Sequence, residues 1–571
     1  MRTLQLALAA TALVLAQAGR SDNYEVWASD QSNSVTGLES RGVAGSYIWI
    51  WKSNKIEKQI SKGRDAKPIG CGRGYAGRVG PCDLNEVFPG NLREVDGNSA
   101  RTGNKLRDLN GFGRLHGMLP DRFGKYVTAN IFAPTGGYVG VIDTKTKEAV
   151  ALFRVTGTNV GGGTDVRSVH MSLWSKDGSQ IQVANLHGKL LERIDVVRNR
   201  KGKIVDLIFN KAASLGLGKG MQVTAPATVF RGRNQHGNKL LGKVRGEYSP
   251  DAFSDTIRDT QVCKEDGCEE GALVGRPNNV IICPVPSEAG LSYVTMGGGG
   301  LLIVNTFATP MEIVGSYGNT KINGAGCGGG QTGDTMWLNA GVSAGGAGAT
   351  WSTFTMYNLN DSDYLTAQPE DTPLPTIVYD DEGNTATGGH QDGESANTSG
   401  QLPGSSTRRD AHGLAVTIDN KYVHNVDRIQ NKIEVFSAED KVWVGTYDLT
   451  SIDGQGDGIG ACDAKSVVDD AGLPRNDPAP DLLESTPDGK YLMVAFRGPV
   501  PVSVTHSAQG SCPGVGIVEL TNDGRSGKLV SVLRTTNTVD TAPVSAPGGH
   551  PYTGAERSDI HGATVVYRQS P

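Results

Sequence analysis

The chain reads His412-Gly-Leu-Ala-Val-Thr-Ile418, then Asp419-Asn420, then Tyr422-Val-His-Asn425, and after a polar turn Lys432-Ile-Glu-Val-Phe436. Three short apolar runs are thus separated by two turns. Runs rich in Val, Ile and Tyr that are joined by Asp-Asn or Asp-Gly turns are typical of antiparallel strands in tight hairpins. The stretch therefore predicts three consecutive strands of one small sheet.

The same pattern recurs elsewhere in the chain, which indicates a repeat fold built from small sheets. Its copies begin at Leu482, at His116 and at His170. These segments resemble the YVTN-type β-propeller repeat, and the nearest matches are Tyr126-Val-Thr-Ala-Asn130 and Asp488-Gly-Lys-Tyr491. The resemblance covers four blades and implies a β-propeller, in which each blade is one antiparallel sheet.

Two further blades are predicted in the region 205–410, where glycines and insertions blur the pattern. One uses residues 279–283, 291–295 and 301–305, and the other uses the region of Cys327, residues 335–339 and residues 352–357. The seventh blade is split between the chain ends. Residues 24–27 and 47–51 lack an innermost strand, which His561 to Tyr567 supplies. We therefore predict an all-β, seven-bladed propeller closed by pairing of the N- and C-terminal strands.

Three segments do not fit the repeat and are predicted as insertions in a single domain of residues 19–571. They are residues 61–113, 210–275 and 360–409. The last contains Asn360 and Asn397, which are N-glycosylation acceptors if the host is eukaryotic.

Composition and the N-terminus indicate an exported protein. The net charge of −5 over 571 residues does not favour nucleic acid as a partner. Residues 1–18 combine Arg2, an apolar stretch and Ala16-Gln-Ala18, which predicts a signal peptide. No later segment is long and apolar enough to predict a membrane span. The expected location is secreted or extracytoplasmic.

The eight cysteines agree with an oxidising compartment. Since no pair has zinc-finger spacing, disulfides are favoured over a zinc site. We predict Cys71–Cys82, Cys263–Cys268 and Cys462–Cys512, with Cys283–Cys327 as the remaining pair. Since Cys327 also falls at the start of an innermost strand, a free thiol near the axis stays open as an alternative.

Four histidines fall in the same slot, at the start of the predicted innermost strands. In ring order the slot holds His561, His116, His170, Asn278 or Asn279, Cys327, His412 and Asp481. Imidazoles that converge on a propeller axis suit a transition metal, with iron or copper favoured. Asp410 and Asp559, two residues before a slot histidine, are expected to accept hydrogen bonds from the ring N–H groups.

An equally weighted interpretation is that the slot histidine is only a shared element of the repeat that satisfies local hydrogen bonds. We predict such local bonds for His187 and His424, which lie outside the slot. The chain is similar in architecture and histidine placement to axial-histidine propellers, among them carotenoid-cleaving oxygenases, nitrous oxide reductase and the selenium-binding/methanethiol oxidase family. That similarity implies no substrate.

Three functions follow as hypotheses. The preferred one is a secreted metalloenzyme, an oxidase or oxygenase of a small organic substrate, with His116, His170, His412 and His561 as metal ligands. A metal-dependent lyase or hydrolase is a variant. The alternative is a non-enzymatic extracellular scaffold that binds a ligand, because a fold alone does not fix a function. The sequence assigns no catalytic residue beyond these ligands.

Overall fold

A computed structural model gives the architecture, and all structural statements below concern the residues that it describes. These are residues 23–32, 47–71, 79–96, 103–109, 112, 114–133, 136–160, 164–217, 221–253, 281–318, 321–322, 324, 326–341, 353–365, 373–380, 409–428, 430–449, 478–499, 510, 512–537, 544–545, 553–554 and 556–568.

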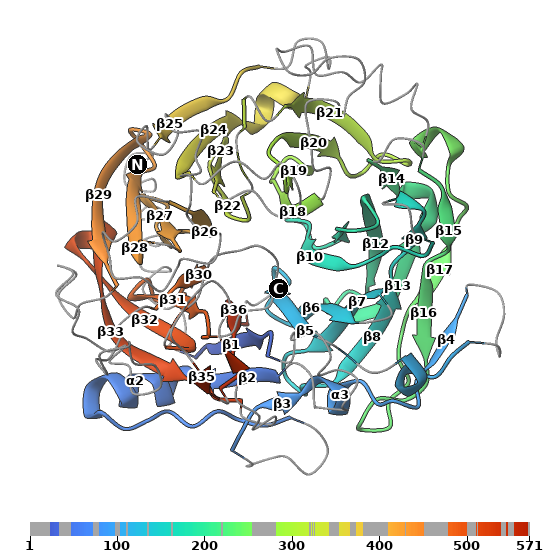
Figure 1. Cartoon of the computed structure of the whole chain (residues 1–571), viewed down its shortest axis with the longest axis horizontal. Helices are drawn as coiled ribbons and strands as arrows, with labels where there is room; N and C mark the ends of the chain where they lie inside the picture. Colours follow the sequence, from blue (N-terminus) through green and yellow to red (C-terminus); the bar gives the residue numbers. More distant parts are fainter. Residues whose placement is uncertain are drawn as a thin grey trace, which may run out of the picture.

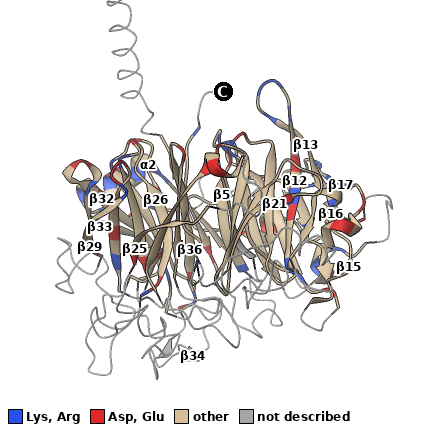
Figure 2. Cartoon of the chain, turned by 90° about the horizontal axis from the view of Figure 1, so that it is seen from above, with Lys and Arg blue, Asp and Glu red and all other residues tan. Residues whose placement is uncertain are grey.

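Seven sheets of four to six strands, antiparallel except for the pair of outer strands β13 and β17, stand around one axis, which confirms the seven-bladed propeller (Figure 1). Seen edge-on, the blades stand side by side in a single layer (Figure 2). We number the blades by their innermost strands, in ring order. The fold does not establish membership of the YVTN family, which stays a prediction.

Blade 1 closes the ring. Its strands, from the axis outward, are β36 (Ile560–Val566), β1 (Glu25–Asp30), β2 (Tyr47–Lys52) and β3 (Cys82–Asp83). Strands β36 and β1 run antiparallel, with Trp27 opposite Thr564, so the two ends of the chain share one sheet. The predicted closure is confirmed. Segment 61–113 is not wholly an insertion, because β3 is the fourth strand of this blade.

Blades 2 and 3 carry extra strands. Blade 2 contains β5 (Arg114–Pro120), β6 (Tyr126–Ala133), β7 (Gly136–Asp143), β8 (Ala149–Arg154), β16 (Thr228–Arg231) and β4 (Arg93–Val95). Blade 3 contains β10 (Val169–Trp174), β11 (Gln180–Asn185), β12 (Leu190–Arg198), β13 (Ile204–Asn210) and β17 (Lys243–Arg245), with β14 (Leu215–Gly216) beside β12. The described part of segment 210–275 therefore widens these two sheets, and β15 (Val223–Ala225) pairs with β9 (Gly157–Thr158).

Blades 4 and 5 lie where the repeat pattern is weakest. Blade 4 contains β18 (Ile281–Pro286), β19 (Leu291–Met296), β20 (Leu301–Asn305) and β21 (Glu312–Tyr317). Blade 5 contains β22 (Gly329–Thr332), β23 (Thr335–Ala340), β24 (Thr355–Asn360) and β25 (Thr376–Asp380). Both blades were predicted, and residues 279–280 of the expected first strand of blade 4 lie outside the described residues. Strand β25 comes from segment 360–409, which was predicted as an insertion.

Blades 6 and 7 carry the clearest repeats. Blade 6 contains β26 (Ala411–Val416), β27 (Tyr422–Asp427), β28 (Lys432–Ser437) and β29 (Val442–Asp448). Blade 7 contains β30 (Pro480–Ser485), β31 (Tyr491–Phe496), β32 (Gly514–Thr521) and β33 (Ser526–Arg534). Among the described residues the α-helices are α2 (Ser53–Lys62) and α3 (Leu84–Val87), and a short strand pair, β34 (Val544–Ser545) and β35 (Thr553–Gly554), precedes β36.

A recurrent hydroxyl–aspartate turn explains the repeated motif between the first two strands of a blade. In blade 6, Thr417 donates to Asp419 at 2.7 Å and accepts from the amide of Tyr422 at 3.0 Å. In blade 7, Thr486 makes the same two bonds, with Asp488 at 2.5 Å and with Tyr491 at 3.1 Å. The side chains thus satisfy the turn's polar groups, which fixes the hairpin and its register.

The hydrophobic core is divided among the interfaces between neighbouring blades. One cluster, for example, joins Ile433 and Val435 of blade 6 to Leu492 and Val494 of blade 7, and all four are fully buried. Since each blade packs on two neighbours, the ring needs no central hydrophobic plug, and polar groups can occupy the axis. No described helix is long and apolar enough to cross a membrane.

Two predicted disulfides are present. Cys71–Cys82 joins the segment after α2 to β3, and Cys283–Cys327 joins blade 4 to the segment that enters blade 5. The free-thiol alternative for Cys327 is therefore wrong. Cys512 is disulfide-bonded, and its predicted partner Cys462 lies outside the described residues. The signal peptide, the pair Cys263–Cys268, Asn278, Asn279 and Asn397 also lie outside them.

Candidate metal centre on the propeller axis

A β-bulge marks the slot in five of the seven innermost strands, and a sixth bulge lies in β18. The register shifts at His561, His116, His170, His412 and Asp481, and in β18 it shifts between Ile281 and Pro284. A bulge bends the strand and redirects a side chain. The shared bulge explains why the repeat turns one side chain per blade towards the axis.

All four slot histidines lie in one buried cluster. Their exposed fractions, and that of Asp481, are between 0 and 3%, so none of these five side chains lies at the surface. His116 Nε2 lies 3.0 Å from His170 Nε2, and the rings of His116 and His561 stack with centroids 3.9 Å apart. The centroids of His412 and His561 are 5.8 Å apart. The predicted convergence of the imidazoles is present.

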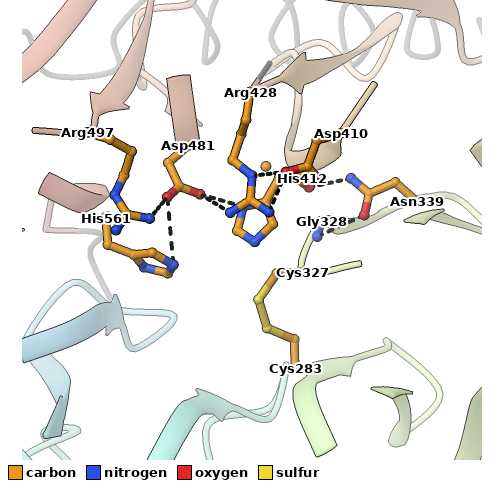
Figure 3. Close-up of polar contacts among 12 residues, drawn as sticks. Cys283, Cys327, Gly328, Asn339, Asp410, His412, Arg428, Asp481, Arg497 and His561 are labelled. Atoms are coloured by element: carbon orange, nitrogen blue, oxygen red, sulfur yellow. Dashed lines mark hydrogen bonds and ion pairs between the residues drawn. A yellow bond between two sulfur atoms is a disulfide. The ribbon is translucent and has the colours of Figure 1, made fainter. Parts of the chain in front are cut away.

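One group of potential ligand atoms combines His412, His561 and Asp481, whose atoms all lie within 4.8 Å of one another. The Nδ1 atom of His412 lies 2.5 Å from one Asp481 oxygen, and Nε2 of His561 lies 3.9 Å from the other. Figure 3 shows both rings facing the carboxylate. Asp481, predicted only as axial lining, therefore belongs with the ligand candidates, while His116 and His170 form an adjoining pair.

Two buried arginines hold the carboxylates in place. Arg497 donates to Asp481 at 2.8 Å (Figure 3). It also makes two bonds to Asp559, at 2.7 and 2.8 Å. Arg428 contacts Asp410 through Nε and a terminal nitrogen, both at 2.7 Å. Bidentate guanidinium–carboxylate pairs fix orientation as well as charge. The bidentate pair with Asp559 thus fixes the Arg497 guanidinium, which donates its remaining bond to Asp481.

The expected role of Asp559 is wrong. It accepts hydrogen bonds from Arg497, whereas the two ring nitrogens of His561 have no hydrogen-bond partner among the described residues. Asp410 likewise lies against Arg428, and the carboxylate that faces the His412 ring is Asp481. The physical reason is that alternation along a strand places residues two apart on one face only where no bulge intervenes.

Electrostatics favour neutral imidazoles and an ionised Asp481. Burial, together with neighbouring His561, His170 and arginines, holds the pKa of His116 well below its usual value. Burial also lowers the pKa of His561 and His412, although Asp481 acts in the opposite direction. For Asp481, burial alone would raise the pKa, but the surrounding histidines and arginines lower it well below its usual range. Neutral imidazole and carboxylate are the forms that bind metal.

An apolar cavity of about 380 Å³ continues the axis beyond the histidines. Each innermost strand contributes residues that follow its slot position, such as Met118, Met171, Leu414 and Leu482. A cavity of this size suits a small organic molecule. The slot layer and the cavity are therefore adjacent levels of the same seven strands.

Polar side chains line part of this cavity. They include Arg122, Lys176 and Glu484. Burial raises the pKa of half-buried Glu484 to about 8, even though its carboxylate accepts a hydrogen bond from the Val565 amide at 2.8 Å. A carboxyl that keeps its proton at neutral pH can serve as a proton donor.

The sequence also led to predictions for the two histidines outside the slot and for the slot of blade 4. His187 bonds Ser168 at 2.8 Å, and His424 bonds Tyr447 and the Gly524 carbonyl, so both make the local bonds expected of them. In blade 4, Cys283 of β18 contacts the axial cluster, where the slot had been assigned to Asn278 or Asn279.

Sequence reasoning missed Arg428 and Arg497. A signal for them exists, since each lies six residues after the tyrosine that opens the second strand of its blade, Tyr422 or Tyr491. An alignment of blades 6 and 7 on these tyrosines would have placed both guanidinium groups at the same level of the ring.

Comparisons with known proteins give likenesses but no family. No protein-family model matches the chain, and no curated protein matches it in sequence. The chain is similar to a putative 6-phosphogluconolactonase from Bacteroides fragilis, with 12% identity over 90% of this chain and 98% of that one and a TM-score of 0.38. It is also similar to a periplasmic gluconolactonase from Pseudomonas aeruginosa (8% identity, 96% and 100% covered, TM-score 0.40) and to a protein from Lactobacillus plantarum (9%, 96% and 100%, TM-score 0.40). At these values no substrate or residue role carries over.

Proposed function

We propose that the protein is an exported, metal-dependent oxidoreductase that acts on a small organic molecule at the propeller axis. The observation that supports this most is the buried group of His412, His561 and Asp481, in which the ring nitrogens of His561 make no hydrogen bond among the described residues. Leaving a buried polar atom unpaired costs free energy, and a bound cation would remove that cost.

The donor set also favours a particular kind of metal. Two imidazoles and one carboxylate that leave coordination positions open are typical of non-haem iron sites, and imidazole also suits copper. Such a metal would supply redox chemistry with oxygen, or polarisation of a carbonyl group. Iron is therefore the first choice and copper the second.

The protein's own residues have separate roles in this proposal. Arg497 orients Asp481 by donating to one carboxylate oxygen at 2.8 Å, which leaves the other oxygen directed at the His412 ring. The apolar cavity binds the organic part of the substrate and excludes water. Glu484, protonated at neutral pH, can donate a proton to a substrate held in that cavity.

Metal content and oxygen consumption together test this proposal. Full-length protein is purified, its metal is measured by mass spectrometry, and it is supplied with iron(II) or copper and a panel of small alcohols, aldehydes and alkenes. We expect about one metal ion per chain, with His412→Ala, His561→Ala and Asp481→Asn each lowering metal content at least tenfold. His187→Ala is the control, because its bonds lie away from this group.

Two outcomes of this experiment would support a different function. Metal-bound protein that consumes no oxygen but cleaves esters or lactones supports the hydrolase variant. Wild-type protein that binds no metal supports the scaffold alternative. For that alternative, the specific observation is that Arg497 links Asp481 of blade 7 to Asp559 at the entry to blade 1, a contact that would hold the ring together without any metal.

A further inference from the structure

A second set of metal-type ligands lies on the same axis. The Nδ1 atom of His170 lies 3.9 Å from Sγ of Cys283, and the ligand atoms of His170, Cys283 and Cys327 all lie within 4.8 Å of one another. The three residues come from blade 3, from blade 4 and from the segment that enters blade 5. In Figure 3 the disulfide between Cys283 and Cys327 is drawn next to the His412 ring.

The His170 ring can present a lone pair to these sulfur atoms. Its Nε2 atom faces Nε2 of His116 at 3.0 Å, which leaves Nδ1 directed at Cys283. A neutral imidazole carries one proton, so a ring that donates from Nε2 has an unprotonated Nδ1. A hydrogen bond at one ring nitrogen commonly orients a metal-binding histidine through the other.

We propose that reduction of the Cys283–Cys327 disulfide creates a Cys₂His site for a thiophilic metal, zinc or copper(I). A dithiol reductant supplies two electrons to the S–S bond, the protein gains two thiols, and the reductant closes its own disulfide. Binding of one metal ion then releases two protons as both thiols become thiolates.

The surrounding geometry fits such a site. Zinc–sulfur bonds of about 2.3 Å and zinc–nitrogen bonds of about 2.0–2.1 Å place tetrahedral ligand atoms roughly 3.5–3.8 Å apart. The Sγ to Nδ1 distance of 3.9 Å is already close to this spacing. Both cysteines line the axial cavity, and Cys327 is half-buried, so a small reductant, a metal ion and a fourth ligand have a route to them.

The chain offers a matched control in Cys71–Cys82. That disulfide lies away from the axis, and no metal-type group that includes it occurs among the described residues. The proposal is independent of the site formed by His412, Asp481 and His561, because that site contains no sulfur and needs no reduction.

Cobalt(II), used as a spectroscopic substitute for zinc, provides the test. Full-length protein is reduced with dithiothreitol, desalted under anaerobic conditions and titrated with cobalt(II), beside oxidised protein. We expect the thiolate-to-cobalt charge-transfer band only after reduction, with one additional cobalt bound per chain. Cobalt bound by oxidised protein without this band reports on the His412 site instead.

Three variants test which residues produce the thiolate-to-cobalt charge-transfer band. The double variant Cys283→Ser/Cys327→Ser should lose it, whereas Cys71→Ser/Cys82→Ser should keep it. His170→Gln retains both cysteines and should weaken cobalt binding at least tenfold, with a melting curve of each variant to verify folding. Reduced wild-type protein without the band, or a band that survives in Cys283→Ser/Cys327→Ser, would overturn the proposal.

Discussion

The axis has two levels that the same seven strands build, and they differ in kind. The slot level contains His116, His412, His561 and Asp481, held by buried arginines. The next level contains methionines, leucines and an open cavity of about 380 Å³. A step of one or two residues along each innermost strand therefore separates charge and metal-type ligands from apolar space.

This difference shows how a repeat fold can hold a site without losing stability. The blade interfaces are apolar and supply the hydrophobic contribution, so the slot can depart from good packing. Substitutions in the slot level should change stability mainly through the charge that they remove. Substitutions in the cavity level should change it mainly through the side-chain volume that they remove. The following predictions test that contrast, beginning with the largest effect.

Removal of the Arg497 guanidinium should have the largest effect. Arg497→Met leaves the carboxylates of Asp481 and Asp559 buried without their partner, and breaking a buried ion pair in this way costs roughly 3–5 kcal/mol. Urea denaturation measures the change in unfolding free energy. The exposed pair Lys528–Glu519 is the control, where Lys528→Met should cost less than about 1 kcal/mol. Equal losses of unfolding free energy in the two variants would mean that charge matters no more on the buried axis than at the exposed surface.

Acid should destabilise the protein through its buried histidines. A histidine with a lowered folded-state pKa contributes fully above about pH 6.5, and that contribution is lost as the pH falls towards the folded-state pKa. Burial lowers the pKa of His424 to about 4, which predicts a loss of roughly 3 kcal/mol between pH 7 and pH 4 from this residue. The axial histidines act in the same direction.

Denaturation of wild type and His424→Gln at pH 7 and pH 4 separates the two contributions. His424 lies in the second strand of blade 6, away from the slot. The variant should lose part of the pH dependence and keep the part due to the axis. A variant with no remaining acid sensitivity would mean that the slot histidines are not buried neutral groups.

In the apolar level, Met171→Ala should cost roughly 2 kcal/mol, near the low end for methionine truncation, because one side of Met171 already faces the cavity. Met336→Ala is the matched comparison, since Met336 is fully buried in the cluster between blades 4 and 5. It should cost more than Met171→Ala in the same denaturation experiment. The opposite order would show that the cavity wall is packed as tightly as the blade interfaces.

The smallest predicted effect is a gain in stability, whereas the preceding changes are losses. In the presence of a chelator, His561→Leu should raise the unfolding free energy by about 1 kcal/mol, because the wild-type ring keeps two buried nitrogens without a hydrogen bond among the described residues. With metal added, wild type should gain stability and the variant should not. A variant that is less stable than wild type under both conditions would favour a purely structural histidine.

Much of this architecture could be predicted from sequence, because the turn chemistry is local. The hydroxyl–aspartate turns at Thr417 and Thr486 are short-range patterns, and the surplus strand at His561 indicated closure. Slot histidines were identified because each opens an apolar run. In blade 4 no histidine marks the start of β18; the predicted slot residues Asn278 and Asn279 lie outside the described residues, and Cys283 contacts the axial cluster.

The partners of the slot residues could not be predicted in the same way. The expectation for Asp559 assumed regular alternation, which the bulge at His561 breaks. Asp481 becomes a ligand candidate only because Arg497, from the next strand of its own blade, orients it. Such contacts depend on how seven strands converge in space, which spacing along one strand does not encode.

The most direct test of the central claim is anomalous X-ray scattering from crystals of the full-length protein soaked in iron(II) or copper(II). The account predicts one anomalous peak on the axis, about 2.0–2.2 Å from a ring nitrogen of His412, a ring nitrogen of His561 and an oxygen of Asp481. The peak should vanish in His561→Ala crystals. Absence of any peak at these residues in the wild-type crystals would contradict the account.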